Sequence, residues 1–135
     1  MKKIQQMVIE EVEYLNNGDL DGVCKYYSED VVFGDTSDPE NPAVGMAEFR
    51  EAMKAFFDGF SDLKVEIQRF LFTEDDNVCG AEYILSGTLD GSFAGIGPTG
   101  RKMEIPAISI YELRGDLFCK EFIYWDMGKM LEQLQ

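Results

Sequence analysis

The main change in the spacing of apolar residues along this chain restricts the possible folds more than any other feature of the sequence. Up to residue 57 the apolar residues recur every three or four positions, a period that indicates helices. After Asp62 they alternate with polar residues, which indicates strands that bury one face. Helices followed by a run of long antiparallel strands predict an α+β domain, with the helices packed on one face of a curved sheet.

The first part of the chain predicts three helices and one short strand. Helices are expected over residues 4–15 and 46–57, where the apolar stripes are continuous. Between them Asp19 can cap another helix, whose buried stripe would contain Leu20, Val23, Cys24 and Tyr27. A short strand at residues 31–33 then leads into a loop over residues 34–45, which contains two prolines and several other turn-forming residues.

The second part predicts four strands and a C-terminal helix. The strands are expected over residues 65–72, 78–89, 103–113 and 117–125. In the first of them the alternation slips at Arg69, because Phe70 and Phe72 take the apolar places, and a β-bulge there would restore one buried face. Apolar residues between Met127 and Leu134 predict the final short helix.

The length of the chain favours one domain, formed by residues 1–135. Hydrophobic residues make up 45% of the chain, which is enough for a core. No apolar run approaches the roughly 20 residues that cross a bilayer. Lys2 and Lys3 are followed by polar residues rather than by an apolar stretch, so no signal peptide is predicted and a cytoplasmic location is expected.

The net charge and the lack of histidine exclude several classes of function. A net charge of -14 repels phosphate backbones and anionic lipids, so neither nucleic acid nor membrane is an expected partner. Without histidine the chain cannot form a Ser-His-Asp triad, a Cys-His pair or an imidazole zinc site, and no metal site is predicted. Cys24, Cys79 and Cys119 lack metal-binding spacing and are expected to be small buried hydrophobes. Acid–base chemistry would therefore depend on Asp, Glu, Tyr, Lys or Cys.

Several strings follow one another in a recognisable order, at residues 26–33, 45–50, 60–63, 87–91, 97–101, 125–126 and 131–134. In these strings the chain resembles the SnoaL-like polyketide cyclases of the nuclear transport factor 2-like superfamily. The resemblance implies a cone in which a six-stranded sheet bends around three helices and leaves an internal pocket for a small, largely apolar ligand. It also implies a homodimer formed through the outer face of the sheet, and chemistry that needs neither a metal nor an organic cofactor.

The resemblance implies that Asp126, at the end of the last strand, is a general base. An aspartate between Trp125 and Met127 that faced an apolar pocket would lose hydration, and this would raise its pKa and make it a better base. Asp126 also directly precedes the C-terminal helix, so the alternative is an N-cap. Many relatives carry a histidine at the position of Leu89, which leaves the role of the acid partner to a tyrosine.

Asp35 is the second candidate for a catalytic carboxylate, since steroid isomerases of the same superfamily place an aspartate after a similar strand. Its alternative is an Asx-turn with the polar residues that follow it. The expected ligand-binding side chains are Tyr14, Tyr27, Tyr83, Tyr111, Trp125 and Phe56. Tyrosines at amphipathic spacing also occur in cores, Trp125 could belong to the dimer face, and Phe56 could be a core residue.

Two functions remain open from the sequence. The first is a cofactor-free acid–base enzyme, similar to a polyketide cyclase or a ketosteroid isomerase, that acts on a small hydrophobic carbonyl compound in an internal pocket. The second is a non-catalytic domain of the same fold that binds a small molecule or another protein.

Overall fold

The computed structural model describes residues 1–135 and confirms the α+β class, with a bent six-stranded sheet and four helices. The helices are α1 (Lys3–Asn16), α2 (Leu20–Cys24), α3 (Met46–Gly59) and α4 (Met127–Leu134). The strands are β1 (Tyr27–Asp35), β2 (Ala43–Val44), β3 (Lys64–Phe72), β4 (Val78–Thr88), β5 (Lys102–Arg114) and β6 (Leu117–Tyr124). Their order in the sheet is β2-β1-β6-β5-β4-β3.

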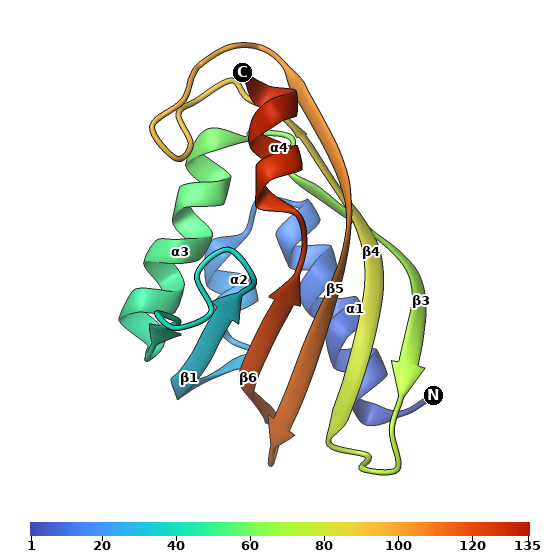
Figure 1. Cartoon of the computed structure of the whole chain (residues 1–135). Coiled ribbons are helices and arrows are strands. Elements are labelled where there is room, and N and C mark those ends of the chain that lie inside the picture. Colours follow the sequence, from blue (N-terminus) through green and yellow to red (C-terminus); the bar gives the residue numbers. More distant parts are fainter.

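The sheet bends over the three N-terminal helices, as Figure 1 shows. α1 packs against β3 and β4, and α3 packs against β1 and β2. α4 lies at one end of the sheet, beside the long connection between β4 and β5 (Figure 1), where the Thr99 hydroxyl donates to the Leu134 carbonyl at 2.9 Å. No helix has the length and apolar character that crossing a bilayer requires.

The inner face of the sheet is built by alternation, and Gly80 is the one further buried residue of β4 and β5. Along β4 and β5 every second residue is buried, from Cys79 to Gly87 and from Met103 to Leu113. These side chains pack against the apolar stripes of the helices, which include Val8 of α1 and Phe49 of α3. The period of two that the sequence shows after Asp62 therefore places one residue in two inside the cone.

The predicted bulge in β3 is confirmed. β3 and β4 pair in antiparallel register, and the register shifts between Ile67 and Arg69, where Gln68 is the extra residue. Before the shift the odd-numbered residues Val65 and Ile67 face inward. After the shift the even-numbered Phe70 faces inward, and its ring packs against the core. The bulge thus keeps both halves of a long strand apolar on the same face.

Three local expectations were wrong. Tyr27 begins β1 instead of ending a helix, since α2 is only five residues long. β1 covers nine residues rather than three, and it pairs in parallel with β6, whereas the pairs β3–β4, β4–β5 and β5–β6 are antiparallel. The expected loop over residues 34–45 also contains the short strand β2, at Ala43–Val44.

The reason for the longer β1 is non-local. The Phe118 N–H of β6 donates to the Tyr26 carbonyl at 2.8 Å, and Tyr27 pairs with Phe118. The Tyr27 ring packs against Phe49 and Phe118, with ring centroids 4.2 and 5.3 Å apart. A strand partner that lies about ninety residues away decides the conformation of this segment, and local helical spacing cannot anticipate it.

Candidate active site

An apolar cavity of about 50 Å³ opens between the helices and the inner face of the sheet. Its wall includes residues of α1, α3 and β1 and of the four long strands: Glu11, Val12, Leu15, Phe33, Met53, Phe56, Leu63, Val65, Tyr83, Leu85, Tyr111, Glu121, Ile123 and Trp125. Glu11 and Glu121 are the only carboxylic acids among them. Two carboxyl groups in an otherwise apolar wall are costly to bury, so their surroundings need an explanation.

Glu121 enters the cavity because it occupies an inward position of β6. Glu121 pairs across the sheet with Tyr111 of β5 and, on the other side, with Phe33 of β1. Ile123, two residues further along β6, is buried on the same face. Glu11 enters from the opposite layer, since it lies in the buried stripe of α1 between Val8 and Val12. Only 3% of Glu11 and 5% of Glu121 is exposed.

One chain of hydrogen bonds joins the two carboxyl groups. The Tyr27 hydroxyl lies 2.5 Å from Glu121 Oε1 and 3.0 Å from Glu11 Oε1. On the other side of Glu121, the Ser109 hydroxyl donates to Oε2 at 2.8 Å. The Tyr83 hydroxyl lies 2.9 Å from Ser109 Oγ, and because the Ser109 proton is already used, Tyr83 is the donor.

Counting protons along this chain assigns different charge states to the two carboxyl groups. Tyr27 has one hydroxyl proton, and the shorter contact directs it to Glu121. The contact between Tyr27 and Glu11 then needs a proton on the Glu11 carboxyl, which donates to the Tyr27 oxygen. Each hydroxyl proton of the chain is therefore donated in the direction of Glu121. Glu121 is the ionised carboxyl group of the pair, and Glu11 is the protonated one.

The pKa shifts agree with this assignment. Burial raises the pKa of Glu121 to about 7, and the hydrogen bonds from Tyr27, Ser109 and Tyr111 limit the rise. Burial, followed by the negative charge of Glu121, raises the pKa of Glu11 well above its usual range, and only Tyr27 opposes this effect. Burial also raises the pKa of Tyr27, Tyr83 and Tyr111, so these hydroxyls keep their protons.

Two polar atoms of the cavity residues are buried without any hydrogen-bond partner. They are Glu11 Oε2 and Trp125 Nε1. An unpaired buried polar atom costs about 1–3 kcal/mol, and each one in a native structure therefore points to a missing partner. Tyr27, Glu121, Ser109 and Tyr83 are joined to one another by hydrogen bonds.

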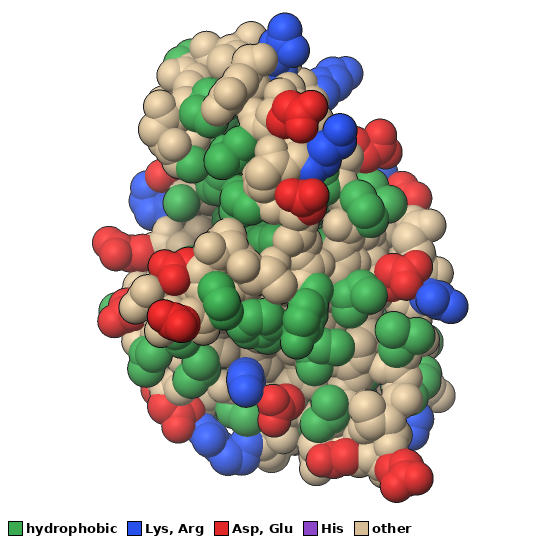
Figure 2. All heavy atoms as spheres, in the orientation of Figure 1, with side chains coloured by type: hydrophobic (Ala, Val, Ile, Leu, Met, Phe, Trp, Pro, Cys, Tyr) green, Lys and Arg blue, Asp and Glu red, His purple; other side chains and the backbone are tan.

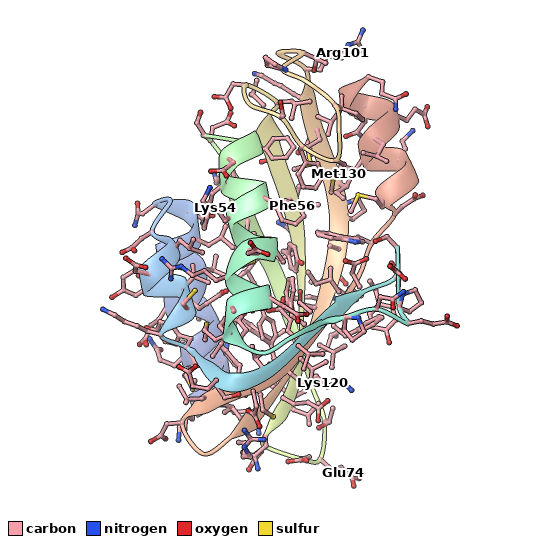
Figure 3. All side chains as sticks on the ribbon, turned by 90° about the vertical axis from the view of Figure 1, so that its left-hand side faces the viewer. Lys54, Phe56, Glu74, Arg101, Lys120 and Met130 are labelled. Atoms are coloured by element: carbon pink, nitrogen blue, oxygen red, sulfur yellow. The ribbon has the colours of Figure 1, made fainter.

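The cavity opens toward the surface beside α3. Phe56 and Trp125 are half-buried, whereas the rest of the wall is buried. Their ring centroids lie 5.6 Å apart, and Phe56 also packs against Phe93 at 4.7 Å. Figure 3 shows Phe56 on the side of α3 that is next to the sheet. These two rings form the mouth, and the carboxyl groups lie deeper.

Comparison of the sequence with protein-family models shows which family the chain belongs to. The family model described as SnoaL-like polyketide cyclase matches residues 4–134, nearly the whole chain. The chain belongs to the SnoaL-like polyketide cyclase family. This SnoaL-like protein has no match among curated protein sequences.

Solved structures place the SnoaL-like protein in the nuclear transport factor 2-like fold. A Jannaschia sp. CCS1 protein described as a SnoaL-like polyketide cyclase superposes with a TM-score of 0.86, at 16% identity, over 98% of this chain and 91% of that one. TsrD from Streptomyces laurentii gives 0.82 at 21% identity, over 98% and 94%. A Catenulispora acidiphila protein with a ketosteroid isomerase-like fold gives 0.77 at 13% identity, over 95% and 91%. At such identities the likeness concerns the fold.

Asp126 and Asp35 lie outside the cavity wall of this SnoaL-like protein. Asp126 is exposed, and its side chain accepts a hydrogen bond from the Lys129 N–H at 2.9 Å, which is the N-cap arrangement. Asp35, at the end of β1, accepts from the Ser37 N–H at 2.7 Å in an Asx-turn. It borders a separate polar hollow near Pro42.

Most of the predicted ligand-binding side chains gather at the cavity. Tyr83, Tyr111, Trp125 and Phe56 line it, and Tyr27 joins the two carboxyl groups behind its wall. Tyr14 is the exception. It is 40% exposed on the outer side of α1, where its ring lies near Tyr26, with centroids 6.0 Å apart.

Sequence reasoning missed Glu11 and Glu121, although both left a signal. Glu11 interrupts the apolar stripe of α1 at a core position, and Glu121 takes an inward position in the alternation of β6. A charged residue at a position where the pattern requires an apolar one is a candidate functional residue, because burial of an unpaired charge is so costly. No group of three or more metal-binding side chains is arranged around an ion site.

Proposed function

We propose that this protein is a cofactor-free acid–base enzyme that acts on a small hydrophobic carbonyl compound, with Glu121 as the general base. The observation that carries the proposal is a carboxyl group with a pKa of about 7 in the wall of an apolar cavity. A base is most effective when its pKa lies near the working pH, because it is then both ionised and a good proton acceptor. Exposed carboxylates, with pKa values near 4, are weaker bases.

Glu121 can accept a substrate proton while it keeps its present partners. Each carboxylate oxygen has two acceptor positions, and the contacts of Tyr27 with Oε1 and Ser109 with Oε2 occupy one of each. In the proposed step Glu121 removes a proton from the carbon next to a carbonyl group; the electron pair of that C–H bond forms the C=C bond of the enolate, and the π pair of the carbonyl group moves to its oxygen. In an isomerisation Glu121 returns the proton to another carbon. In an aldol closure the enolate carbon attacks a second carbonyl, and the proton held by Glu121 goes to the alkoxide that forms.

Tyr111 is the side chain best placed to stabilise the enolate oxygen. It is the cross-strand neighbour of Glu121, and of the three hydrogen bonds that lower the pKa of Glu121 its contribution is the smallest. Its hydroxyl can therefore turn toward a substrate oxygen at the lowest cost. Burial keeps this hydroxyl protonated, as a donor to a developing oxyanion must be.

The size of the cavity limits the substrate. A space of about 50 Å³ holds only a few water molecules, since one water needs roughly 10–15 Å³, and a benzene-binding cavity measures about 150 Å³. A ligand larger than a few atoms must displace side chains at the mouth. Phe56 is half-buried and Met53 is unbranched, so these two can move at the lowest cost.

Deuterium exchange into small ketones tests the proposal. The protein is incubated in D₂O with cyclohexanone, 2-tetralone or acetylacetone, and loss of the α-proton signals is followed by NMR against a buffer control. We expect the exchange rate to rise with pH through about 7, as Glu121 ionises, and to fall about 100-fold or more in Glu121→Gln.

The Asp126→Asn variant distinguishes the two candidate bases. Asparagine caps a helix as well as aspartate does, so the fold is kept while the carboxylate is lost. Exchange that persists in Asp126→Asn and disappears in Glu121→Gln supports Glu121. The reverse result would assign the base to Asp126. Binding of the ketones without exchange in any variant would favour a non-catalytic ligand carrier.

A further inference from the structure

The two unpartnered buried atoms share one cavity but differ in what they need. Trp125 Nε1–H is only a donor, so its missing partner is an acceptor oxygen or nitrogen. Glu11 presents Oε2, and because the single Tyr27 proton is given to Glu121, the proton of the Glu11 carboxyl group is assigned to Oε1, toward Tyr27. Glu11 Oε2 is then the carbonyl-like oxygen, and its missing partner is a donor. Glu11 is 97% buried, by its exposed fraction of 3%, and only something inside the cavity can supply this donor.

The two atoms lie toward different ends of the cavity. Glu11 is joined to Glu121 through Tyr27, and Trp125 comes four residues after Glu121 in the direction of β6. Glu11 is buried deep in the wall, whereas Trp125 is half-buried beside Phe56 at the mouth. A ligand that satisfies both unpartnered atoms therefore carries two separate polar groups, with an apolar body between them that matches the wall.

The charge of the cavity selects for a neutral ligand. Glu121 is ionised above pH 7 and lies next to Glu11, and the whole chain has a net charge of -14. No lysine or arginine lines the cavity. A carboxylate or phosphate in this space would meet like charge in a poorly hydrated environment and would be rejected.

We propose that the natural ligand is a neutral, bifunctional compound, with a hydroxyl or enol group that donates to Glu11 Oε2 and a second oxygen that accepts from Trp125 Nε1. This assignment deepens the proposed function and rests on it for the identity of the reaction site. It fixes the orientation of the substrate, because the hydroxylated or enolisable end lies beside Glu121 and the second oxygen lies at the mouth. A compound with one oxygen alone leaves one of the two atoms without a partner.

A matched set of neutral aromatic probes tests the proposal on the unmodified protein. The set is 4-hydroxyacetophenone, with both groups, acetophenone and 4-ethylphenol, with one group each, and the 4-hydroxybenzoate anion. Affinity is measured by titration calorimetry. We expect 4-hydroxyacetophenone to bind about tenfold more tightly than either singly polar probe, since one hydrogen bond is at stake each time, and the anion to bind most weakly. Equal affinities for the three neutral probes, or binding of none of them, would overturn the proposal.

Variants separate the two contacts. In Glu11→Gln the amide can donate to Tyr27 and present its oxygen to the ligand, so it copies the protonated carboxyl group and should keep the preference for the hydroxyl group. Glu11→Leu should bind 4-hydroxyacetophenone no more tightly than acetophenone. Trp125→Phe should bind 4-hydroxyacetophenone no more tightly than 4-ethylphenol. Trp125 is the only tryptophan, so its single indole N–H resonance should shift downfield when 4-hydroxyacetophenone binds to the wild-type protein and should not shift with 4-ethylphenol.

The outcome is distinct from that of the catalytic test. Selective binding of 4-hydroxyacetophenone without any proton exchange into ketones would contradict the proposed catalysis and leave the assigned ligand class in place. Proton exchange that depends on Glu121, with equal affinities for all three neutral probes, would contradict the ligand class and leave the catalysis in place.

Discussion

Glu11 and Glu121 share one proton chain, yet they differ in charge at neutral pH because their donors are unequal. Glu121 accepts from Tyr27 and Ser109 and has a further interaction with Tyr111, whereas Glu11 contacts Tyr27 alone. Hydrogen bonds to an ionised carboxylate stabilise the charge and limit the rise in its pKa. Two acidic groups with separated pKa values are the arrangement that acid–base catalysis requires.

The raised pKa of Glu121 predicts a stability that falls with pH. Its pKa is about 7 in the folded protein against 4.5 for an unperturbed glutamate, so the folded protein holds the proton more tightly than the unfolded chain does. This contribution to stability is fully present below pH 4.5 and is lost as the pH rises through 7; it amounts to about 3 kcal/mol. Urea unfolding at pH 5 and pH 8 should therefore show a smaller loss of stability in Glu121→Gln than in the wild type. An equal loss in both proteins would contradict the shift.

Tyr27→Phe should move the pH dependence of activity upward. The Tyr27 hydroxyl lowers the pKa of Glu121 more than any other hydrogen bond does, and phenylalanine keeps the ring packing against Phe49. Without this donor the pKa of Glu121 rises. The pH–rate profile for deuterium exchange measures the shift. A variant that loses activity at every pH with an unchanged midpoint would show that Tyr27 acts in some other way.

At the scale of single residues, the sequence identified the aromatic residues of the cavity but not its acids. Tyr83, Tyr111 and Trp125 are at inward positions that alternation alone predicts. Glu11 and Glu121 were passed over because isolated glutamates on a helix and a strand are normally solvated, and only the exact position within each apolar pattern shows that these two are buried. They are linked through Tyr27, which lies 94 residues before Glu121, and this link cannot be read from either pattern.

At the scale of elements, α4 begins at an N-cap whose strength can be measured. Asp126 accepts from the Lys129 N–H at 2.9 Å, and Met130 and Leu134 of the same helix are fully buried. Asp126→Ala should lower the free energy of unfolding by about 1 kcal/mol, while Asp126→Asn should change it by only a few tenths. Urea unfolding of the two variants checks this. Equal stability of both variants would mean that packing of α4 against β5, rather than the cap, fixes its start.

The elements that the sequence predicted well are those defined by local pattern. α1, α3, α4 and the four long strands lie within a few residues of the expected bounds, and the bulge at Gln68 follows from the phase slip at Arg69. β1 was underestimated because its partner is distant. It runs in parallel with β6, and its first residue pairs with Phe118, so its length depends on a contact that has no local signal.

At the scale of the whole molecule, the outer face of the sheet carries an apolar surface. Ile84, Pro106, Ile108 and Tyr124 surround a shallow hollow there, and Tyr124 is 53% exposed. Figure 2 shows hydrophobic side chains in a band across the middle of this side of the molecule, over the strands that Figure 1 places in front. Antiparallel sheets that pack helices on one face leave the other face free for pairing.

We predict that two copies pair through this outer face and that the pairing strengthens with salt. Each copy carries a net charge of -14, so association works against repulsion between like charges, which salt screens over about 10 Å at 0.1 M. Sedimentation equilibrium should show a dimer whose dissociation constant falls as NaCl is raised from about 20 to about 300 mM, a range that spans this screening. Contacts dominated by ion pairs would show the opposite trend.

The Tyr124→Glu variant locates the interface. It places another negative charge in the centre of the apolar band, and loss of a central aromatic residue at an interface costs about 2 kcal/mol or more, close to 30-fold in the dissociation constant. Tyr14→Glu is the matched control, because Tyr14 is similarly exposed but lies on α1, on the helical side of the sheet. We expect Tyr124→Glu to sediment as a folded monomer and Tyr14→Glu to remain dimeric. If the wild-type protein is monomeric at every concentration and salt level, the outer face serves another purpose, and the acid pair in the cavity must function within a single chain.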